Sequence, residues 1–174
     1  MKSLKCFILL VFICFFPFFL FPATIPLHTT SQVYFSPNGG STSAIVDTIL
    51  QAKSEILVQA YSFTSHPIAK ALVNAHKRNI KVEIILDKSQ LTAKSSMLNY
   101  VAQSGIPTYI DNKHAIAHNK IIIVDRKTVI TGSFNFTGSA EEKNAENLLI
   151  IPSNELAKVY IKNYNEHKKH SFKY

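Results

Sequence analysis

HAIAHNKIIIVDRKTVITGSFNF, residues 114–136, is the stretch of this chain that decides its fold. Two runs rich in β-branched residues, 121–124 and 128–131, stand on either side of the polar sequence Asp125-Arg126-Lys127. Two such runs around a short polar turn predict a β-hairpin. The rest of the chain is organised around this hairpin, because the polar residues beside it carry groups that no hydrophobic core requires.

Four polar side chains flank the hairpin. Successive side chains of a strand point to opposite faces, so His118 and Lys120 fall on one face, and Ser133 and Asn135 can share one as well. Gly132 has no side chain, which would let a ligand or another backbone segment approach closely. The pattern therefore predicts an imidazole, an ammonium, a hydroxyl and a carboxamide near one another, a set that suits an anionic group.

The spacing of these residues resembles a known motif. His118-x-Lys120-x4-Asp125-x6-Gly132-Ser133-x-Asn135 is similar to the HKD motif of the phospholipase D superfamily. The segments 60–64 (AYSFT) and 144–147 (NAEN) resemble the small bacterial single-motif nucleases of that superfamily. The likeness runs from about residue 33 to about residue 165 and contains one copy of the motif, where the larger phospholipases carry two.

The resemblance implies a role for each residue. His118 is expected to attack phosphorus and form a phosphohistidine, while the fixed charge of Lys120 stabilises the phosphoryl transition state. Ser133 and Asn135 are expected to donate hydrogen bonds to phosphate oxygens, although both residues could simply form a turn. Glu146 is expected to accept a hydrogen bond from the second nitrogen of His118; the alternative is an exposed strand end.

Asp125 is assigned a different role, although it gives the motif its last letter. It lies five residues after Lys120, which is the wrong parity for the same strand face, and it begins the hairpin turn. We therefore expect Asp125, together with Gly132, to be structural. Lys88, Lys94, Lys113 and Arg126 are candidates to grip the substrate backbone on either side of the site.

A metal site is not predicted. His114 precedes His118 by four residues, and two histidines on one strand face could hold a metal ion, but no third ligand of suitable spacing follows along the chain. Both cysteines, Cys6 and Cys14, lie in the first 23 residues, so the remaining chain has no cysteine for a disulfide, a zinc site or a nucleophile. We expect no metal and no cofactor.

The remaining elements predict an α/β domain. Strands are expected at 33–35, 55–61, 81–86, 107–110 and 145–151. Helices are expected after Thr42 or Ser43, from Ser65 and Pro67, at 97–103 and from Ser153; the tail, 167–174, is expected to fray. Strand, helix and strand in succession imply a right-handed parallel crossover. The prediction is a mixed, mostly parallel sheet with helices on both faces.

Composition sets the domain organisation and the compartment. The 174 residues are 47% hydrophobic and 17% charged, which suits one domain, at 33–174. Residues 1–23 have two lysines before an apolar run, typical of a signal peptide, or of an N-terminal membrane anchor if the segment is retained. We expect an exported protein, periplasmic or secreted, with a linker at 24–32. Removal of residues 1–23 lowers the net charge from +8 to +6, since they contain Lys2, Lys5 and no acids.

The sequence thus predicts a phosphodiesterase. The first hypothesis is a metal-independent endonuclease with little sequence preference, acting on DNA or RNA, because a basic chain attracts polyanions. The alternative is a phospholipase D that cleaves phospholipid head groups, with residues 1–23 as a possible membrane attachment. In-line displacement needs a general acid opposite the nucleophile. One motif supplies a single imidazole, so we expect a homodimer with the site shared across its twofold axis, unless another residue such as His114 serves as the acid.

Overall fold

The structure, a computed structural model, describes residues 24–27 and 29–174. The predicted signal peptide or anchor at 1–23 lies outside these residues. Among the described helices, none is long and apolar enough to span a bilayer. The elements, in chain order, are β1 Gln32–Ser36, α1 Ser41–Leu50, β2 Glu55–Ala60, α2 His66–Lys77, β3 Lys81–Asp87, the short 3-10 helix η1 Lys88–Leu91, α3 Leu98–Gln103, β4 Thr108–Asp111, β5 Lys120–Val124, β6 Thr128–Gly132, α4 Gly138–Glu142, β7 Glu146–Pro152, α5 Asn154–His170 and β8 Phe172–Lys173.

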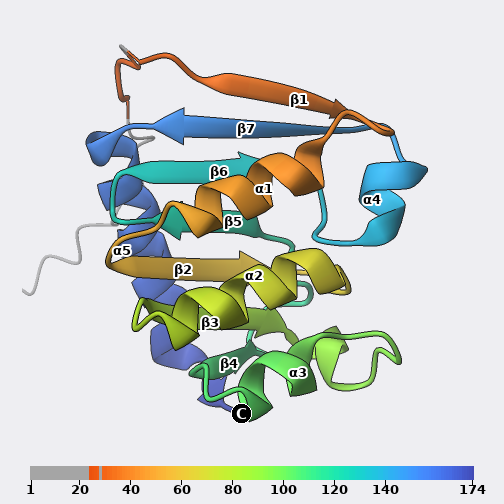
Figure 1. The fold of residues 1–174 in the computed structure, drawn as a ribbon. Helices are drawn as coiled ribbons and strands as arrows, with labels where there is room; N and C mark the ends of the chain where they lie inside the picture. Colours follow the sequence, from red (N-terminus) through yellow and green to blue (C-terminus); the bar gives the residue numbers. More distant parts are fainter. Residues whose placement is uncertain (1–23, 28) are drawn as a thin grey trace, which may run out of the picture.

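The strands form one mixed sheet in the order β1-β7-β6-β5-β2-β3-β4-β8 (Figure 1). The prediction of an α/β fold with a mixed sheet is confirmed, but the sheet is not mostly parallel. Within the described residues only β2–β3 and β3–β4 pair in parallel, and the other five pairings are antiparallel. The short turn between β5 and β6 can join only antiparallel neighbours, whereas β6 and β7 are joined through α4, a connection that leaves their direction to tertiary packing.

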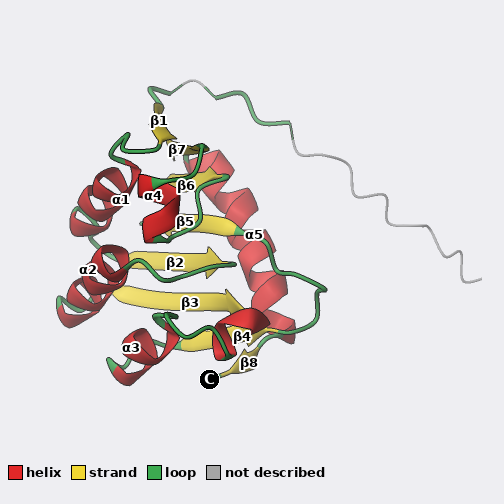
Figure 2. Cartoon of the chain, turned by 90° about the vertical axis from the view of Figure 1, so that its right-hand side faces the viewer, coloured by secondary structure: helices red, strands yellow, loops and turns green. Residues whose placement is uncertain are grey.

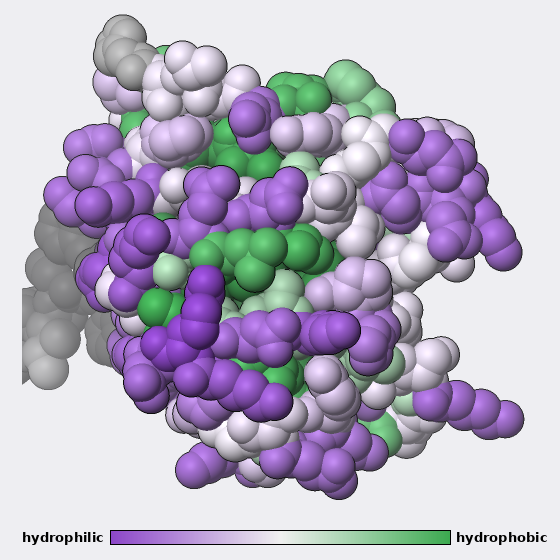
Figure 3. All heavy atoms as spheres, viewed as in Figure 1, coloured by the Kyte–Doolittle hydropathy of each residue, from purple (hydrophilic) through white to green (hydrophobic). Residues whose placement is uncertain are grey.

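Helices cover both faces of the sheet, as predicted. Figure 2 shows α1, α2 and α3 on one face and the long α5 alone on the other. Ile and Val side chains of the inner strands alternate between the two faces, so each face has its own core. The larger core lies under α1 to α3, and the smaller one, around Leu57, Ile85 and Tyr164, lies under α5. Seen from the α1 and α2 side, the outer surface is mostly hydrophilic with smaller apolar areas between (Figure 3).

Two local predictions are wrong. The tail does not fray: α5 continues to His170, and β8 adds to the sheet through Ile110 paired with Phe172. The first turn of α1 is not capped by Thr42 or Ser43. The helix starts at Ser41, and the carboxylate of Glu141 accepts hydrogen bonds from the backbone N–H groups of Gly40 and Thr42. Both differences come from contacts that are distant in the sequence.

Candidate functional site

Four strand ends meet at one edge of the sheet. Because β5 runs antiparallel to β2, its first residue, Lys120, pairs with the last residue of β2, Ala60. Strand β6 returns alongside β5 and ends at Gly132, which pairs with Leu148 of β7. Glu146, the first residue of β7, therefore reaches the same edge. The predicted hairpin is confirmed, and its open end carries the polar groups.

The imidazole and the ammonium of the motif are in contact. Lys120 Nζ lies 3.0 Å from His118 Nδ1 and donates to the carbonyl oxygen of His118 at 2.9 Å. The ring of Tyr61 lies 4.6 Å from the His118 ring, between centroids, and 5.4 Å from Lys120 Nζ. Lys120 is only 7% exposed. Burial lowers the pKa of Lys120, and the negative charge of Glu146 opposes that shift. The ammonium thus lacks water and, among the described residues, has no carboxylate at ion-pair distance.

Glu146 stands at the centre of a second polar group on the same edge. Its carboxylate accepts from Ser133 Oγ at 2.6 Å and from Asn144 Nδ2 at 3.2 Å. Ser133 Oγ in turn accepts from the backbone N–H of Asn147 at 3.0 Å. The sequence predicted a hydrogen bond from His118 to Glu146. The described chain does not contain it, because the two oxygens of Glu146 accept from Ser133 and Asn144 instead. The hydroxyl of Ser133 is exposed and can exchange partners when an anion arrives.

Gly132 allows two strands to come close, which is one of the two uses that the sequence suggested. Its φ of 148° lies in the region that favours glycine, and a Cβ atom there would stand 2.2 Å from the carbonyl oxygen of Asn147. Three residues on, the carboxamide of Asn135 makes no hydrogen bond within the described residues, and its Oδ1 is buried. A buried polar atom without a partner is costly. A bound ligand is one source of the missing partner.

Asp125 lies at the opposite end of the hairpin from His118. Its carboxylate accepts hydrogen bonds from the backbone N–H groups of Lys53, Ser54 and Glu55 and from Ser54 Oγ, at 2.7–3.1 Å. The side chain thus ties the turn to the chain before β2. Arg126 lies in the same turn and pairs with Glu55 at 3.4 Å. The expectation that Arg126 grips the substrate beside His118 is therefore wrong, because the length of β5 separates the two.

The other basic candidates are at the correct edge. Lys88, Lys94 and Lys113 lie on connections that follow β3 and β4, and the carboxyl ends of these parallel strands face the same way as that of β2. Lys88 Nζ donates to the carbonyl oxygen of His114 at 3.0 Å, which ties η1 to the segment before His118. Tyr61, which the sequence analysis noted only as part of a resemblance, also belongs to this site. Its position directly after a buried strand was the available indication.

A second polar cluster was missed by the sequence analysis. Asp111, at the end of β4, is surrounded by His114 from the next loop and by His167 and His170 from α5. Burial raises the pKa of Asp111, but hydrogen bonds from His167 and His170, the backbone of Lys113 and His114 lower it to about 2. The i, i+3 spacing of His167 and His170 was the available indication, since residues at that spacing share a helix face. The assumption of a frayed tail concealed it.

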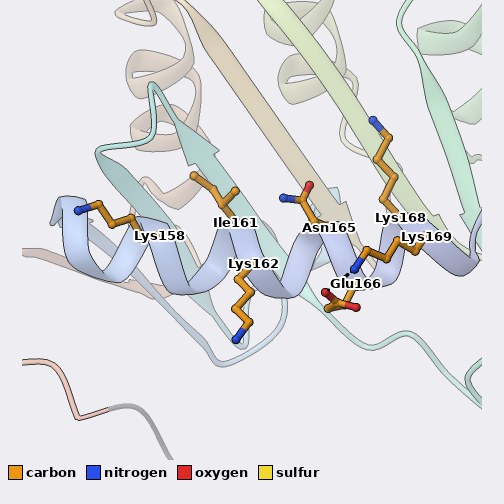
Figure 4. A pocket seen from close by; sticks show the side chains of 7 residues that line it. All are labelled: Lys158, Ile161, Lys162, Asn165, Glu166, Lys168 and Lys169. Atoms are coloured by element: carbon orange, nitrogen blue, oxygen red, sulfur yellow. Dashed lines mark hydrogen bonds and ion pairs between the residues drawn. The ribbon is translucent and has the colours of Figure 1, made fainter.

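One hollow on the described surface lies apart from both clusters. It is lined entirely by side chains of α5: Lys158, Ile161, Lys162, Asn165, Glu166, Lys168 and Lys169. Figure 4 shows them projecting from the two sides of one helix, so the hollow is the open flank of α5 rather than a cleft between elements. We assign it no role in the chemistry at His118, which lies at the edge of the sheet.

Comparison with known proteins gives consistent results. The family model described as the PLD-like domain of cardiolipin synthase matches residues 45–168. A phospholipase D of Rickettsia felis is 46% identical over 142 residues, which are 82% of this chain and 71% of the relative. The crystal structure of Nuc, a phospholipase D family member from Salmonella typhimurium, superposes with a TM-score of 0.80 at 41% identity, covering 83% of this chain and 97% of Nuc. A mitochondrial cardiolipin hydrolase of Mus musculus is 29% identical, covering 71% of this chain and 56% of that protein.

Proposed function

The chain belongs to the phospholipase D superfamily and is one of its phosphodiester hydrolases, and we propose that it is a metal-independent nuclease with little sequence preference. DNA is the proposed substrate, with RNA as the closest variant. The observation that carries the chemistry is the buried ammonium of Lys120, held 3.0 Å from the His118 imidazole with no carboxylate of the described residues at ion-pair distance. A bound phosphodiester would supply the negatively charged partner for the Lys120 ammonium.

The reaction proceeds in two steps. An imidazole nitrogen of His118 attacks phosphorus, the bond from phosphorus to the leaving oxygen breaks, and that oxygen takes up a proton. Water then attacks the phosphohistidine, the P–N bond breaks, and the phosphomonoester leaves. Lys120 stabilises the charge on the phosphoryl oxygens in both steps. We propose that Ser133 and Asn135 hold the same oxygens; the exposure of Ser133 and the buried Asn135 Oδ1, which has no partner among the described residues, support this.

Glu146 influences both Lys120 and Ser133. Burial lowers the pKa of Lys120, and the negative charge of Glu146 opposes that shift and so favours the ammonium form. Glu146 also accepts the hydrogen bond of the Ser133 hydroxyl, which fixes where that hydroxyl stands before substrate binds. We propose that Glu146 positions the phosphate-binding groups within its own chain.

A nucleic acid is favoured by charge. The net charge of the chain is +8, and three exposed lysines, Lys88, Lys94 and Lys113, stand on loops at the edge that carries His118. Contacts of this kind with phosphates release counterions, so binding should weaken steeply as salt rises. Residues 1–23 support export of the enzyme, which gives it access to nucleic acid outside the cytoplasm.

A phospholipid substrate is the second candidate, and one observation favours it. Ile116, two residues before His118, is 56% exposed, and Leu91 at the end of η1 is 45% exposed. Apolar side chains on loops beside a site can insert into a lipid surface. Relatives named phospholipase D and mitochondrial cardiolipin hydrolase point in the same direction. The chemistry at His118 is the same for both substrates.

The working unit that we propose is a twofold dimer. In-line displacement places the nucleophile and the general acid on opposite sides of phosphorus, so one His118 imidazole cannot serve as both in the same step. One chain then has a single imidazole for two opposite tasks. A second copy across a twofold axis supplies the other imidazole.

The deciding experiment offers three substrates to one preparation. Full-length protein, kept soluble in a mild detergent, is incubated with plasmid DNA, with RNA and with phosphatidylcholine vesicles, and a His118→Ala variant serves as the control for contaminating enzymes. We expect DNA or RNA to be cleaved at a rate that falls with salt. Cleavage of the lipid alone would overturn the nuclease proposal and leave the phospholipase D reading in its place.

A further inference from the structure

Three histidines and one aspartate converge on the far side of the loop that leads to His118. Asp111 is fully buried at the end of β4, His114 lies three residues later, and His167 and His170 lie one turn apart on α5. The four candidate ligand atoms all lie within 4.8 Å of one another. The cluster joins residues that are 56 and 59 positions apart in the chain.

One carboxylate gathers three imidazoles around it. Asp111 Oδ2 has His167 Nδ1 at 2.6 Å and His170 Nε2 at 3.3 Å, and His114 Nδ1 lies 3.1–3.2 Å from both oxygens. The backbone N–H of Lys113 also donates to Oδ1, so the four donors take up all the lone pairs of the carboxylate. The ring centroids are only 4.8–5.3 Å apart, so three charged imidazoles would repel one another. A single divalent cation among the four groups satisfies all of them at once.

We propose that Asp111, His114, His167 and His170 bind one Zn²⁺ ion. Imidazole nitrogens and a carboxylate oxygen are ligands that Zn²⁺ takes in proteins, and four protein ligands close the tetrahedron, which is the form of a structural rather than a catalytic site. With bond lengths of 2.0–2.2 Å, tetrahedral ligand atoms stand roughly 3.3 Å apart, so small side-chain rotations complete the site. The two lysines between His167 and His170, Lys168 and Lys169, are paired with Glu83 and Glu166, which reduces their repulsion of a cation.

The ion would clamp the loop that carries the catalytic histidine. Residues 112–119 connect β4 to β5, and His114 contacts α5 near their beginning. Lys88 donates to the His114 carbonyl, and the N–H of Ala117 donates to Asp87, the N-cap of η1. At the end of the loop, Asn119 accepts from the N–H of Tyr61 and from the Gln59 amide. Zinc bound through His114 would therefore fix the loop to α5, the helix that covers the face of the sheet opposite α1, α2 and α3. The ion has no part in attack on phosphorus, since His118 is not among its ligands.

Zinc binding is measured directly on the full-length protein. After treatment with EDTA and removal of the chelator, Zn²⁺ alone is titrated by calorimetry, and bound metal is counted by elemental analysis. We expect one ion per chain and at least about a 10-fold loss of affinity in His114→Ala and in His170→Ala. His114 is exposed, so its variant is the one that keeps the test valid if the helix variant fails to fold. His76→Ala, a half-buried histidine of α2, is the matched control and should bind as the wild type does.

Two results would overturn the proposal. One is wild-type binding no tighter than that of the His114→Ala variant; the other is an equal loss of affinity in His76→Ala, which would mean adventitious binding to histidines. The clamp is tested by amide hydrogen exchange of residues 112–117, which should slow at least about 10-fold when Zn²⁺ is added. Tight binding with unchanged exchange would reject the clamp. None of these readouts requires a substrate, so they stand apart from the outcome of the nuclease assay.

Discussion

Replacing Asp125 with alanine should destabilise the protein without removing its chemistry. The carboxylate accepts three backbone N–H groups and one hydroxyl, and a hydrogen bond to a charged acceptor contributes roughly 1.5 kcal/mol at the low end. Water can replace the carboxylate as acceptor at this half-buried site. We therefore count about half of the sum over the four hydrogen bonds, roughly 3 kcal/mol. Asp125 also has a φ of 52°, which costs alanine about 1 kcal/mol more. The expected loss is about 3–4 kcal/mol, or roughly 10 °C in Tm.

Two variants separate the causes. Asp125→Asn keeps an acceptor and tolerates the left-handed backbone, so it should lose only roughly 1–2 kcal/mol. Asp125→Gly removes the acceptor, but glycine tolerates the left-handed backbone. Its loss of stability should fall between those of Asp125→Asn and Asp125→Ala. Urea unfolding followed by circular dichroism gives the free energies of unfolding, provided that the transitions are two-state. Rates per folded molecule should stay within about twofold of wild type, because β5 separates Asp125 from His118.

The same carboxylate predicts a pH dependence. Burial raises the pKa of Asp125, but hydrogen bonds from the backbone of Glu55, Lys53 and Ser54 outweigh it and hold the pKa below its usual range. A carboxyl whose pKa is lower in the folded state contributes its full stability above the unfolded pKa, about 3.9, and loses it as the pH falls through the folded value. The gap between wild type and Asp125→Asn should therefore be constant near pH 7 and close below about pH 4. An alanine variant within about 1 kcal/mol of wild type, or as inactive as His118→Ala, would refute the structural role.

Four further outcomes are expected. His118→Ala should lose at least about 10³-fold in turnover while its circular dichroism and nucleic-acid binding are retained, since the missing group does chemistry; substantial residual activity would place the nucleophile elsewhere. Initial rates at 25 °C should survive excess EDTA, because Lys120 supplies the charge that a catalytic metal ion would bring; loss of activity that EDTA also causes in His114→Ala, whose proposed zinc site is disrupted, and that magnesium or zinc restores, would contradict this mechanism. Heterodimers of wild-type and His118→Ala chains should be nearly inactive, whereas activity proportional to the wild-type fraction, or a fully active monomer, would exclude the shared site. Gly132→Ala should cost roughly 2–4 kcal/mol or prevent folding, because its Cβ collides with the Asn147 carbonyl; near-wild-type unfolding in urea would show that β6 and β7 can move apart.

Much of the fold could be predicted because its signals are local. The β-branched runs on either side of Asp125 specify the hairpin, and the alternation of their side chains places Lys120 and the Gly132 region at one edge. The mostly antiparallel pairing was not predicted. The order and direction of the strands depend on which strands pair in the folded chain, and local sequence patterns indicate this pairing only weakly.

The sequence by itself determined the chemistry of this protein: one motif, in which the residue types and their spacing name the nucleophile, His118, and its cation, Lys120. Only the tertiary structure decided which groups surround them. It directs Glu146 to Ser133 rather than to His118, separates Arg126 from the site by the length of a strand, and brings His167 and His170 to Asp111. The first two contacts follow from the pairing of β6 with β7 and of β5 with β2, and the third follows from the packing of α5 across the sheet; no local spacing records any of these.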